Sequence, residues 1–444
     1  MINASALSRW TLGALAGALL APCAAQDWPM YMGSPTHLGA AARAPAADVA
    51  SFTRLWSIDL HAEISASPVI AGATLYAGAE NGNLSAYALP ERSLKWLFHS
   101  RGGIASTPAV AAGLVYFLSR DGHFYALDAA TGAPRWTFQT LGEAVFSAYG
   151  MYGLNGAPQP VPDPWDFYLS SPVVDEGKVY FGSSDAHVYA LDAASGKLLW
   201  AFKTGGVVHS SPAISKGTLL VGSWDGVLYA LDAVSGAERW RFKTRTEQKD
   251  SILLGIQASP AIDGDTVYIG ARDGYLYALD LASGAHKWRY DAQGSWIVGT
   301  VAVDAGRVYA GTSDTGLLVA LDKRTGREIY RYDSKVWTYA APLVVGDTVW
   351  AATMKGALVA LRADTGQPRW SYQSAQGQAD ASQLLDAQGR FDSARLFGSA
   401  PHQLYGALEH VKRLGAFTSA PIWYRGQLII ANALGEIAGF GAKE

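Results

Sequence analysis

Aromatic and acidic side chains gather in one stretch of the sequence, in a combination that suits the binding of a ligand or a partner. The stretch ends in PVPDPWDFYLSSP and contains Asp163, Trp165, Asp166 and Tyr168. Aromatic faces beside carboxylates are suited to sugars, peptides or a flat cofactor. Ordinary packing of a loop uses the same residue types, so both interpretations stay open. We take these four residues as the predicted partner-binding group.

A second set of candidates lies three positions before the proline of a Ser-Pro pair that recurs along the chain, where side chains are expected near a common axis. Its members are Ser65, Ala105, Leu169, His209, Gln257, Val298, Tyr339 and Thr418. The set is mostly neutral, whereas a calcium site needs six to eight oxygen ligands, several of them charged. His209 suits a ligand or a base, and equally a hydrogen-bonded role without chemistry. The candidates for binding a cofactor at this channel mouth are His209, Gln257, Trp296, Trp337 and Tyr339.

Other chemistries lack the residues that they need. The sequence has no nucleophile–base pair, phosphate loop or metal-ligand spacing, and its Gly-rich strings lie in repeat turns. A single Cys excludes a disulfide scaffold, a Cys-based zinc site and a covalently attached c-type haem. The 35 basic and 38 acidic residues give no electrostatic basis for binding nucleic acid. We therefore assign no catalytic residue, no metal ligand and no nucleic-acid partner.

The elements that position these candidates belong to a repeat of about forty residues, clearest as SSPAISKGTLLVGSWDGVLYALDAVSGAERWRFKT over 210–244. Each copy ends in an aromatic residue, and these are Trp56, Trp96, Trp136, Trp200, Trp240, Trp288, Tyr330 and Trp370. Each copy begins at Pro68, Pro108, Pro172, Pro212, Pro260, Val301, Pro342 or Pro421. Four short strands separated by Gly-containing turns fit within one copy. Eight such units predict an all-β fold, an eight-bladed β-propeller of four-stranded antiparallel blades.

The ends of the repeat array predict how the ring closes. The first terminal aromatic, Trp56, has no strands of its own before it, and the last copy has no terminal Trp. We expect the segment around Leu55-Trp56-Ser57 to supply the outer strand of the last blade, which removes open sheet edges. Residues 26–444 are then a single domain.

Three long inserts, at about 141–167, 245–254 and 374–416, fall in links between blades and therefore on one face of the ring. Loops on a rigid scaffold often carry function, so this insert-bearing face is the predicted contact surface. Tolerance of insertion on one face is the alternative. The third insert contains a helical pattern from Pro401 to Leu414, with apolar residues at three- and four-residue steps.

The string A-x-D-x-x-[ST]-G-x-x-x-W resembles the tryptophan-docking motif of the quinoprotein, or PQQ-like, β-propellers, and is closest in style to the BamB-like exported propellers. It is present as Asp128/Gly132/Trp136, and again at Asp192, Asp232 and Asp280. The resemblance covers nearly all of the chain after the leader. It implies that the Trp side chains pack between blades as structural elements.

The resemblance implies two different functions. Quinoprotein dehydrogenases hold pyrroloquinoline quinone (PQQ) with Ca²⁺ on the axis, whereas BamB-like members bind no cofactor and act through protein contacts. This chain lacks the adjacent Cys pair of many dehydrogenases. We predict a non-catalytic protein-binding or scaffold subunit of the bacterial cell envelope, a monomer within a complex, with no cofactor. The alternatives are a PQQ- and calcium-dependent dehydrogenase and a glycan- or peptide-binding propeller.

The first 25 residues are predicted to be an export signal. A short start with one basic residue, Arg9, precedes an apolar run from Thr11 to Ala21 that is too short to span a bilayer. Cleavage after Ala25 predicts a periplasmic protein without a transmembrane span. The alternative is an outer-membrane lipoprotein acylated at Cys23.

Overall fold

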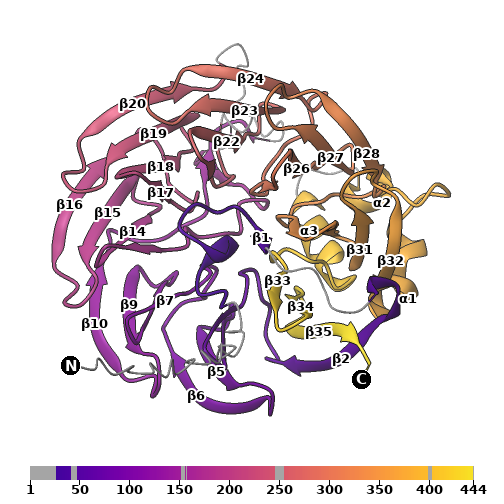
Figure 1. Cartoon of the computed structure of the whole chain (residues 1–444), viewed down its shortest axis with the longest axis horizontal. Helices are drawn as coiled ribbons and strands as arrows, with labels where there is room; N and C mark the ends of the chain where they lie inside the picture. Colours follow the sequence, from indigo (N-terminus) through magenta and orange to yellow (C-terminus); the bar gives the residue numbers. More distant parts are fainter. Residues whose placement is uncertain are drawn as a thin grey trace, which may run out of the picture.

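Eight four-stranded antiparallel sheets form a ring around a central axis (Figure 1). The computed structural model describes residues 27–41, 48–151, 156, 158–245, 255–398 and 403–443. The predicted eight-bladed all-β propeller is confirmed. The predicted signal peptide, and with it Cys23, lies outside the described residues, as does most of the insert at 245–254.

Each of the first four blades consists of four strands that follow one another along the chain, from the innermost strand to the outermost. Blade 1 is β3 (Val69–Ala71), β4 (Thr74–Gly78), β5 (Asn83–Ala88) and β6 (Ser93–His99), and blade 2 is β7 (Ala109–Ala111), β8 (Leu114–Leu118), β9 (His123–Asp128) and β10 (Pro134–Gln139). Blade 3 is β13 (Val173–Asp175), β14 (Lys178–Gly182), β15 (His187–Asp192) and β16 (Leu198–Lys203). Blade 4 is β17 (Ala213–Ser215), β18 (Thr218–Gly222), β19 (Val227–Asp232) and β20 (Glu238–Lys243).

The other four blades complete the ring. Blade 5 is β21 (Ala261–Asp263), β22 (Thr266–Gly270), β23 (Tyr275–Asp280) and β24 (His286–Asp291), and blade 6 is β25 (Ala302–Val303), β26 (Arg307–Gly311), β27 (Leu317–Asp322) and β28 (Glu328–Asp333). Blade 7 is β29 (Leu343–Val345), β30 (Thr348–Ala352), β31 (Ala357–Arg362) and β32 (Pro368–Gln373). Blade 8 is β33 (Ile422–Tyr424), β34 (Gln427–Ala431), β35 (Glu436–Ala442) and β2 (Phe52–Asp59).

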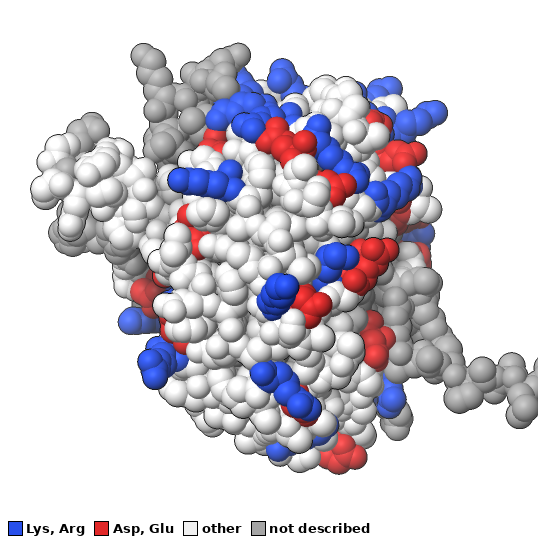
Figure 2. All heavy atoms as spheres, turned by 90° about the vertical axis from the view of Figure 1, so that its left-hand side faces the viewer, with Lys and Arg blue, Asp and Glu red and all other residues white. Residues whose placement is uncertain are grey.

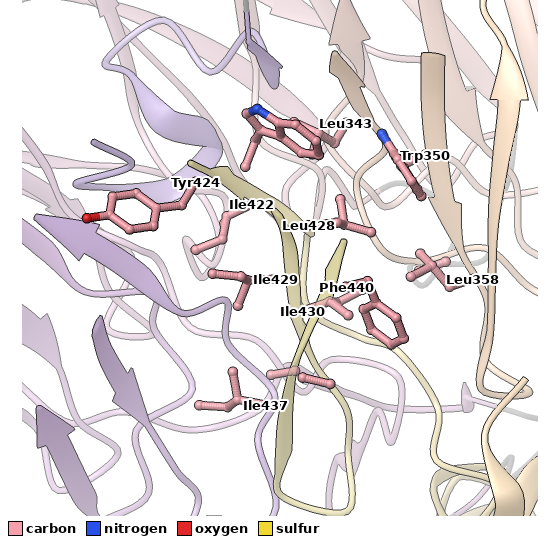
Figure 3. Packing of buried hydrophobic residues seen from close by; sticks show 14 of the residues in the cluster. Leu343, Trp350, Leu358, Ile422, Tyr424, Leu428, Ile429, Ile430, Ile437 and Phe440 are labelled. Atoms are coloured by element: carbon pink, nitrogen blue, oxygen red, sulfur yellow. The ribbon is translucent and has the colours of Figure 1, made fainter. Parts of the chain in front are cut away.

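Blade 8 is closed by the N-terminal strand, as the repeat phase predicts. Strand β2 pairs antiparallel with β35, and Trp56 lies opposite Gly439. Phe52 at the start of β2 is buried and stacks near Trp350 of blade 7, with ring centroids 5.6 Å apart. Figure 3 shows the core at this junction, where side chains of blade 7 meet those of blade 8. Strand β2, from the N-terminal part of the chain, and the C-terminal strand β35 are therefore held together in one sheet.

The segment over residues 27–41, which we call the axial strap, crosses the centre of the ring (Figure 1). It forms backbone hydrogen bonds with the innermost strands of six blades, through Ile70, Val110, Ile214, Ile262, Val303 and Val344. Its last residues form β1 (Ala40–Ala41), which pairs parallel with β29. Innermost strands otherwise present unpaired backbone groups to the axis, and the strap satisfies part of them.

The terminal aromatic residues of the repeats bond across the boundaries between blades. The indole N–H of Trp96 donates to the carbonyl oxygen of Ala129 in the next blade at 3.1 Å, and Trp136 donates likewise to Ala193. Trp200, Trp240 and Trp288 repeat the contact, and Tyr330 makes it through its hydroxyl group.

The Ser or Thr of each Ser-Pro pair forms a second set of contacts between blades, around the axis. The backbone N–H of Ser67 donates to the hydroxyl of Thr107, and that of Thr107 to the hydroxyl of Ser171. The series continues from Ser171 to Ser211 and from Ser211 to Ser259, and it begins at Ala420, which donates to Ser67. These hydrogen bonds, which we call the hydroxyl ring, give the Ser-Pro pair its structural role.

Two inserts add structure to the links between blades. The first holds the short hairpin β11 (Ser147–Ala148) and β12 (Val161–Pro162). The third holds α1 (Ala375–Leu384), α2 (Ser393–Phe397) and α3 (Gln403–Arg413), and α3 confirms the helical pattern seen in the sequence. Short 3-10 turns occur at Tyr31–Gly33 and Val49–Ser51. Within the described ranges, no helix is long and apolar enough to cross a membrane.

Candidate functional site

A buried ion pair anchors the first insert to the mouth of the axis. Arg272, in the second-to-third turn of blade 5, pairs with Asp163 of the insert at 2.5 Å, and both side chains are fully buried. Asp163 also accepts the backbone N–H of Trp165. Buried charges persist only when they are paired and hydrogen-bonded, so this contact fixes the insert on the ring.

The guanidinium group of Arg272 fills a slot between two indole rings. Its central carbon lies 4.3 Å from the ring of Trp224 and 4.2 Å from that of Trp296. Gln257 accepts from the same guanidinium and donates to the carbonyl oxygen of Trp165. Cations are attracted to aromatic faces, so the slot that would suit a flat ligand is occupied by the protein's own side chain.

A second buried group joins the insert to blades 3 and 4. Asp166 lies 2.8 Å from Nδ1 of His209, and Nε2 of His209 lies 2.7 Å from Oγ of Ser184. Glu143 of the insert accepts from both the backbone N–H and the hydroxyl of Ser184, and burial raises the pKa of Glu143. The acid–histidine–serine order is that of hydrolase triads, but the hydroxyl and amide of Ser184 are directed at Glu143. The group therefore holds the insert and lacks the free amide donor of an oxyanion hole.

Aromatic and aliphatic side chains from both inserts close the rest of the mouth. Trp165 packs edge-on against Trp337, with ring centroids 5.0 Å apart, and also contacts Tyr339 and Phe397 of α2. Tyr168 donates to the carbonyl oxygen of Thr418 at 2.8 Å, and burial raises the pKa of Tyr168 well above its usual value. One apolar cluster thus joins the first insert, the third insert and the inner strands.

A small cavity remains on the axis between this apolar cluster and the strap. His209, Gln257, Tyr339 and, from the strap, Tyr31 line it, together with hydroxyl groups of the ring. Its volume is about 40 Å³, which is room for roughly three water molecules. A tricyclic quinone with a calcium ion does not fit such a space.

The donor set at the mouth does not match a calcium-bound quinone either. The two central carboxylates, Asp163 and Asp166, are already paired with Arg272 and His209. In the part of the chain that the structure describes, no three His, Cys, Asp or Glu side chains are grouped to hold a metal ion. Calcium needs six to eight oxygen ligands, and these residues do not offer them in this arrangement.

All nine predicted site residues lie at this one mouth. His209, Gln257, Trp296, Trp337 and Tyr339 converge there, and their part in binding a cofactor stays a prediction. Asp163, Trp165 and Asp166 are buried, and Tyr168 is half-buried. Their part in partner binding stays a prediction, and these side chains would contribute by shaping the insert.

Sequence reasoning missed several residues that complete the site. Arg272, Trp224, Ser184 and Arg120 all precede the Asp of a second-to-third turn, in the strings ARDG, SWDG, SSDA and SRDG. Arg120 pairs with Glu80 at 3.2 Å and donates to the carbonyl oxygen of Phe167. The position before that Asp therefore points to the mouth, and its variation among copies was the available signal.

The eight four-stranded blades and their inter-blade aromatic contacts define an eight-bladed β-propeller of the PQQ-like type. A family model described as outer membrane protein assembly factor BamB matches residues 42–152, 163–295 and 272–391, and the chain belongs to this family.

Individual relatives point in two directions. The crystal structure of BamB from Moraxella catarrhalis aligns with a TM-score of 0.62 and 18% identity, over 88% of this chain and 98% of that one. Quinohemoprotein alcohol dehydrogenase from Comamonas testosteroni aligns with a TM-score of 0.70 and 15% identity, over 94% and 81%. The dehydrogenase subunit of a quinone-type alcohol dehydrogenase from Gluconobacter oxydans is 30% identical over 167 residues, which span 34% of this chain and only 20% of that protein. The two structural likenesses define the fold alone.

Proposed function

We propose that this protein is a non-catalytic, protein-binding propeller of the bacterial cell envelope, and that it contacts its partner through the insert-bearing face. The observation that carries the proposal is the closed mouth, where Arg272, Asp163 and Trp165 occupy the space that a ligand on the axis would need. A face whose centre is filled by its own anchored inserts offers a surface rather than a pocket.

Exposed apolar side chains on the first insert support a role in contacts. Leu141 is 82% exposed and Tyr149 is 67% exposed, although both belong to a segment that is anchored below by buried charges. Leu434, in the second-to-third turn of blade 8 on the same face, is 37% exposed. Tyrosine is enriched in protein interfaces, and exposed leucine side chains add apolar area that a partner can bury.

Membership in the family described as outer membrane protein assembly factor BamB supports an envelope partner. The expected export signal at residues 1–25 fits the same location. On this proposal the protein is a periplasmic subunit that works as a monomer within a complex.

Site-specific photo-crosslinking in cells tests the proposal. A photoreactive residue at position 149 is expected to give a discrete adduct with an envelope protein, identified by mass spectrometry. Position 234 is the matched control, because Val234 is also 67% exposed but lies in a third-to-fourth turn on the opposite face. Equal labelling from both positions would contradict the proposal.

Titration of the mature protein with PQQ and calcium tests the alternative. A ligand that binds the folded state raises the melting temperature by mass action. Saturable binding with such a rise would mean that the closed mouth opens for the quinone. The dehydrogenase alternative would then replace the scaffold proposal.

A further inference from the structure

The boundary between blade 8 and blade 1 is built differently from the boundaries that follow it. At six boundaries an aromatic ring lies directly over a glycine of the next blade's third-to-fourth turn, so that an added Cβ would meet the ring at 2.3–2.6 Å. These glycines are Gly132, Gly196, Gly236, Gly284, Gly326 and Gly366. Each ring therefore fills the space between two blades.

Trp56, the equivalent residue of blade 8, turns back onto its own blade. Its ring lies over Gly439 of β35, and its indole N–H donates to Oε1 of Gln427 in β34 at 2.8 Å. The opposing turn of blade 1 reads ALPERS over residues 88–93 and has no glycine. Arg92 adopts a positive φ of 58° there in place of the usual glycine. The space that an aromatic ring fills elsewhere is left open here.

This space is a pocket, which we call the seam pocket. Its walls are Trp56, Leu89, Tyr424 and Ile429, and Arg92 and Arg425 stand at it. Its volume is about 70 Å³, room for roughly five groups the size of a water molecule. A leucine side chain, with four carbon atoms, matches that room.

The charge at the seam pocket is positive. Two guanidinium groups and no carboxylate are among its lining residues. Within the described residues, neither Arg92 nor Arg425 forms an ion pair, and Arg425 lies over the ring of Tyr424 at 5.1 Å. The nearby carboxylate of Asp27 already accepts the backbone N–H of Gly72. Guanidinium groups bind carboxylates with paired hydrogen bonds, so the pocket is complementary to an acidic ligand.

We propose that the seam pocket binds a peptide segment of a partner protein, in which a leucine-sized apolar side chain is flanked by carboxylates. The apolar side chain enters between Trp56 and Tyr424, and the carboxylates meet Arg92 and Arg425. The pocket is formed by first-to-second and third-to-fourth turns, which lie on the face opposite the inserts. The site is therefore separate from the contact surface of the proposed function.

Calorimetric titration of the chain over residues 26–444 with short blocked peptides tests the proposal. Acetyl-Asp-Leu-Asp-amide is expected to bind saturably, and more weakly as salt is added. The peptides acetyl-Asp-Ala-Asp-amide and acetyl-Lys-Leu-Lys-amide are each expected to bind at least about tenfold more weakly, because they lack the apolar or the acidic half of the ligand.

The matched variants are Arg92→Asn/Arg425→Asn and Arg324→Asn/Arg327→Asn. Asn tolerates the positive φ of Arg92 and Arg425, so the first pair should fold normally. Arg324 and Arg327 are exposed in the corresponding turn of blade 6, where Trp288 covers Gly326. The first pair is expected to weaken binding at least about tenfold and the second to leave it unchanged.

Absence of saturable binding up to several millimolar, or equal affinity for the alanine peptide, would overturn the seam-pocket proposal. Equal affinity in the two double variants would do the same. None of these results bears on crosslinking from position 149, so the two proposals fail independently.

Discussion

At the scale of single residues, Arg272 links the first insert to the ring. Its charge is balanced by Asp163, its faces are covered by Trp224 and Trp296, and its N–H groups are shared with Gln257. A guanidinium group serves such a site better than an ammonium group because it is planar and has several fixed donors. The residue is thus a cation held in the place where a bound ligand would be expected.

Replacing Arg272 tests this role. Arg272→Met removes the cation that faces the buried carboxylate of Asp163, and we expect the free energy of unfolding, measured in urea, to fall by about 3–5 kcal/mol. The double variant Asp163→Asn/Arg272→Met should recover part of that loss, since the buried negative charge is removed as well. Arg289→Met is the control, because Arg289 is exposed over Tyr275, and it should cost under about 1 kcal/mol. Similar losses in all three variants would refute the role of the buried pair.

His37 of the axial strap gives the fold a pH dependence. Its side chain is buried, its Nδ1 lies 3.1 Å from the carbonyl oxygen of Pro260, and burial lowers its pKa to about 4. The unfolded chain takes up the proton near pH 6.5, whereas the folded protein resists it. The contribution of His37 to stability is therefore fully present above pH 6.5. As the pH falls toward 4, the free energy of unfolding falls by about 3 kcal/mol on account of this residue.

The variant His37→Asn isolates this contribution. Asn tolerates the positive φ of 56° at this position and can donate to the same carbonyl group. As the pH falls from 6.5 to 4, we expect the unfolding free energy of the natural protein to fall more than that of the variant. Parallel pH profiles would show that His37 does not control this window.

At the scale of elements, the sequence predicts what repetition determines and misses what irregular segments decide. The alternating strands, the Ser-Pro starts and the closure at Trp56 follow from the repeat, because each copy must bury the same faces. The third insert's helix was predicted over 401–414 and runs from Gln403 to Arg413, because its apolar spacing is local information. The course of α1 and α2 was not predicted, since α1 has little apolar periodicity to indicate it.

The candidate site follows the same division. The mouth could be located from the register of His209 and Tyr339 within their repeats. The pairing of Arg272 with Asp163 could not, since the two residues are 109 positions apart and one lies in an irregular insert. The strap over 27–41 was also missed, because its backbone contacts with six blades carry no side-chain signature.

At the scale of the whole molecule, the chain itself occupies the axis at the insert-bearing mouth and at the centre of the ring. The inserts fill one mouth, the strap crosses the centre, and the hydroxyl ring joins neighbouring blades between them. Figure 2 shows basic and acidic side chains interspersed on one side of the molecule, with basic groups gathered near its upper edge. The described part of the chain therefore fills most of the space that a central channel would take.

The closure of the ring at β2 and β35 gives the final prediction. Ser57 of β2 lies opposite Ala438 of β35, and opposed residues of antiparallel strands have Cα atoms about 4.5–5.5 Å apart, which suits a disulfide. The only natural Cys is Cys23, in the expected signal peptide, so the mature double variant Ser57→Cys/Ala438→Cys has no competing thiol.

Oxidation of that variant joins the two ends of the propeller and removes entropy mainly from the unfolded chain. We expect the oxidised protein to unfold at a higher urea concentration than the same protein under reduction, with a gain of up to about 5 kcal/mol. The reduced variant is its own control, because it carries the same substitutions without the bond. Ready disulfide formation with a single unfolding transition at higher urea would show that the pairing of β2 with β35 limits the stability of the ring. An unchanged midpoint would mean that unfolding begins elsewhere, at a boundary between blades. The boundary between blades 8 and 1 would be the first to examine, because Trp56 does not cross it.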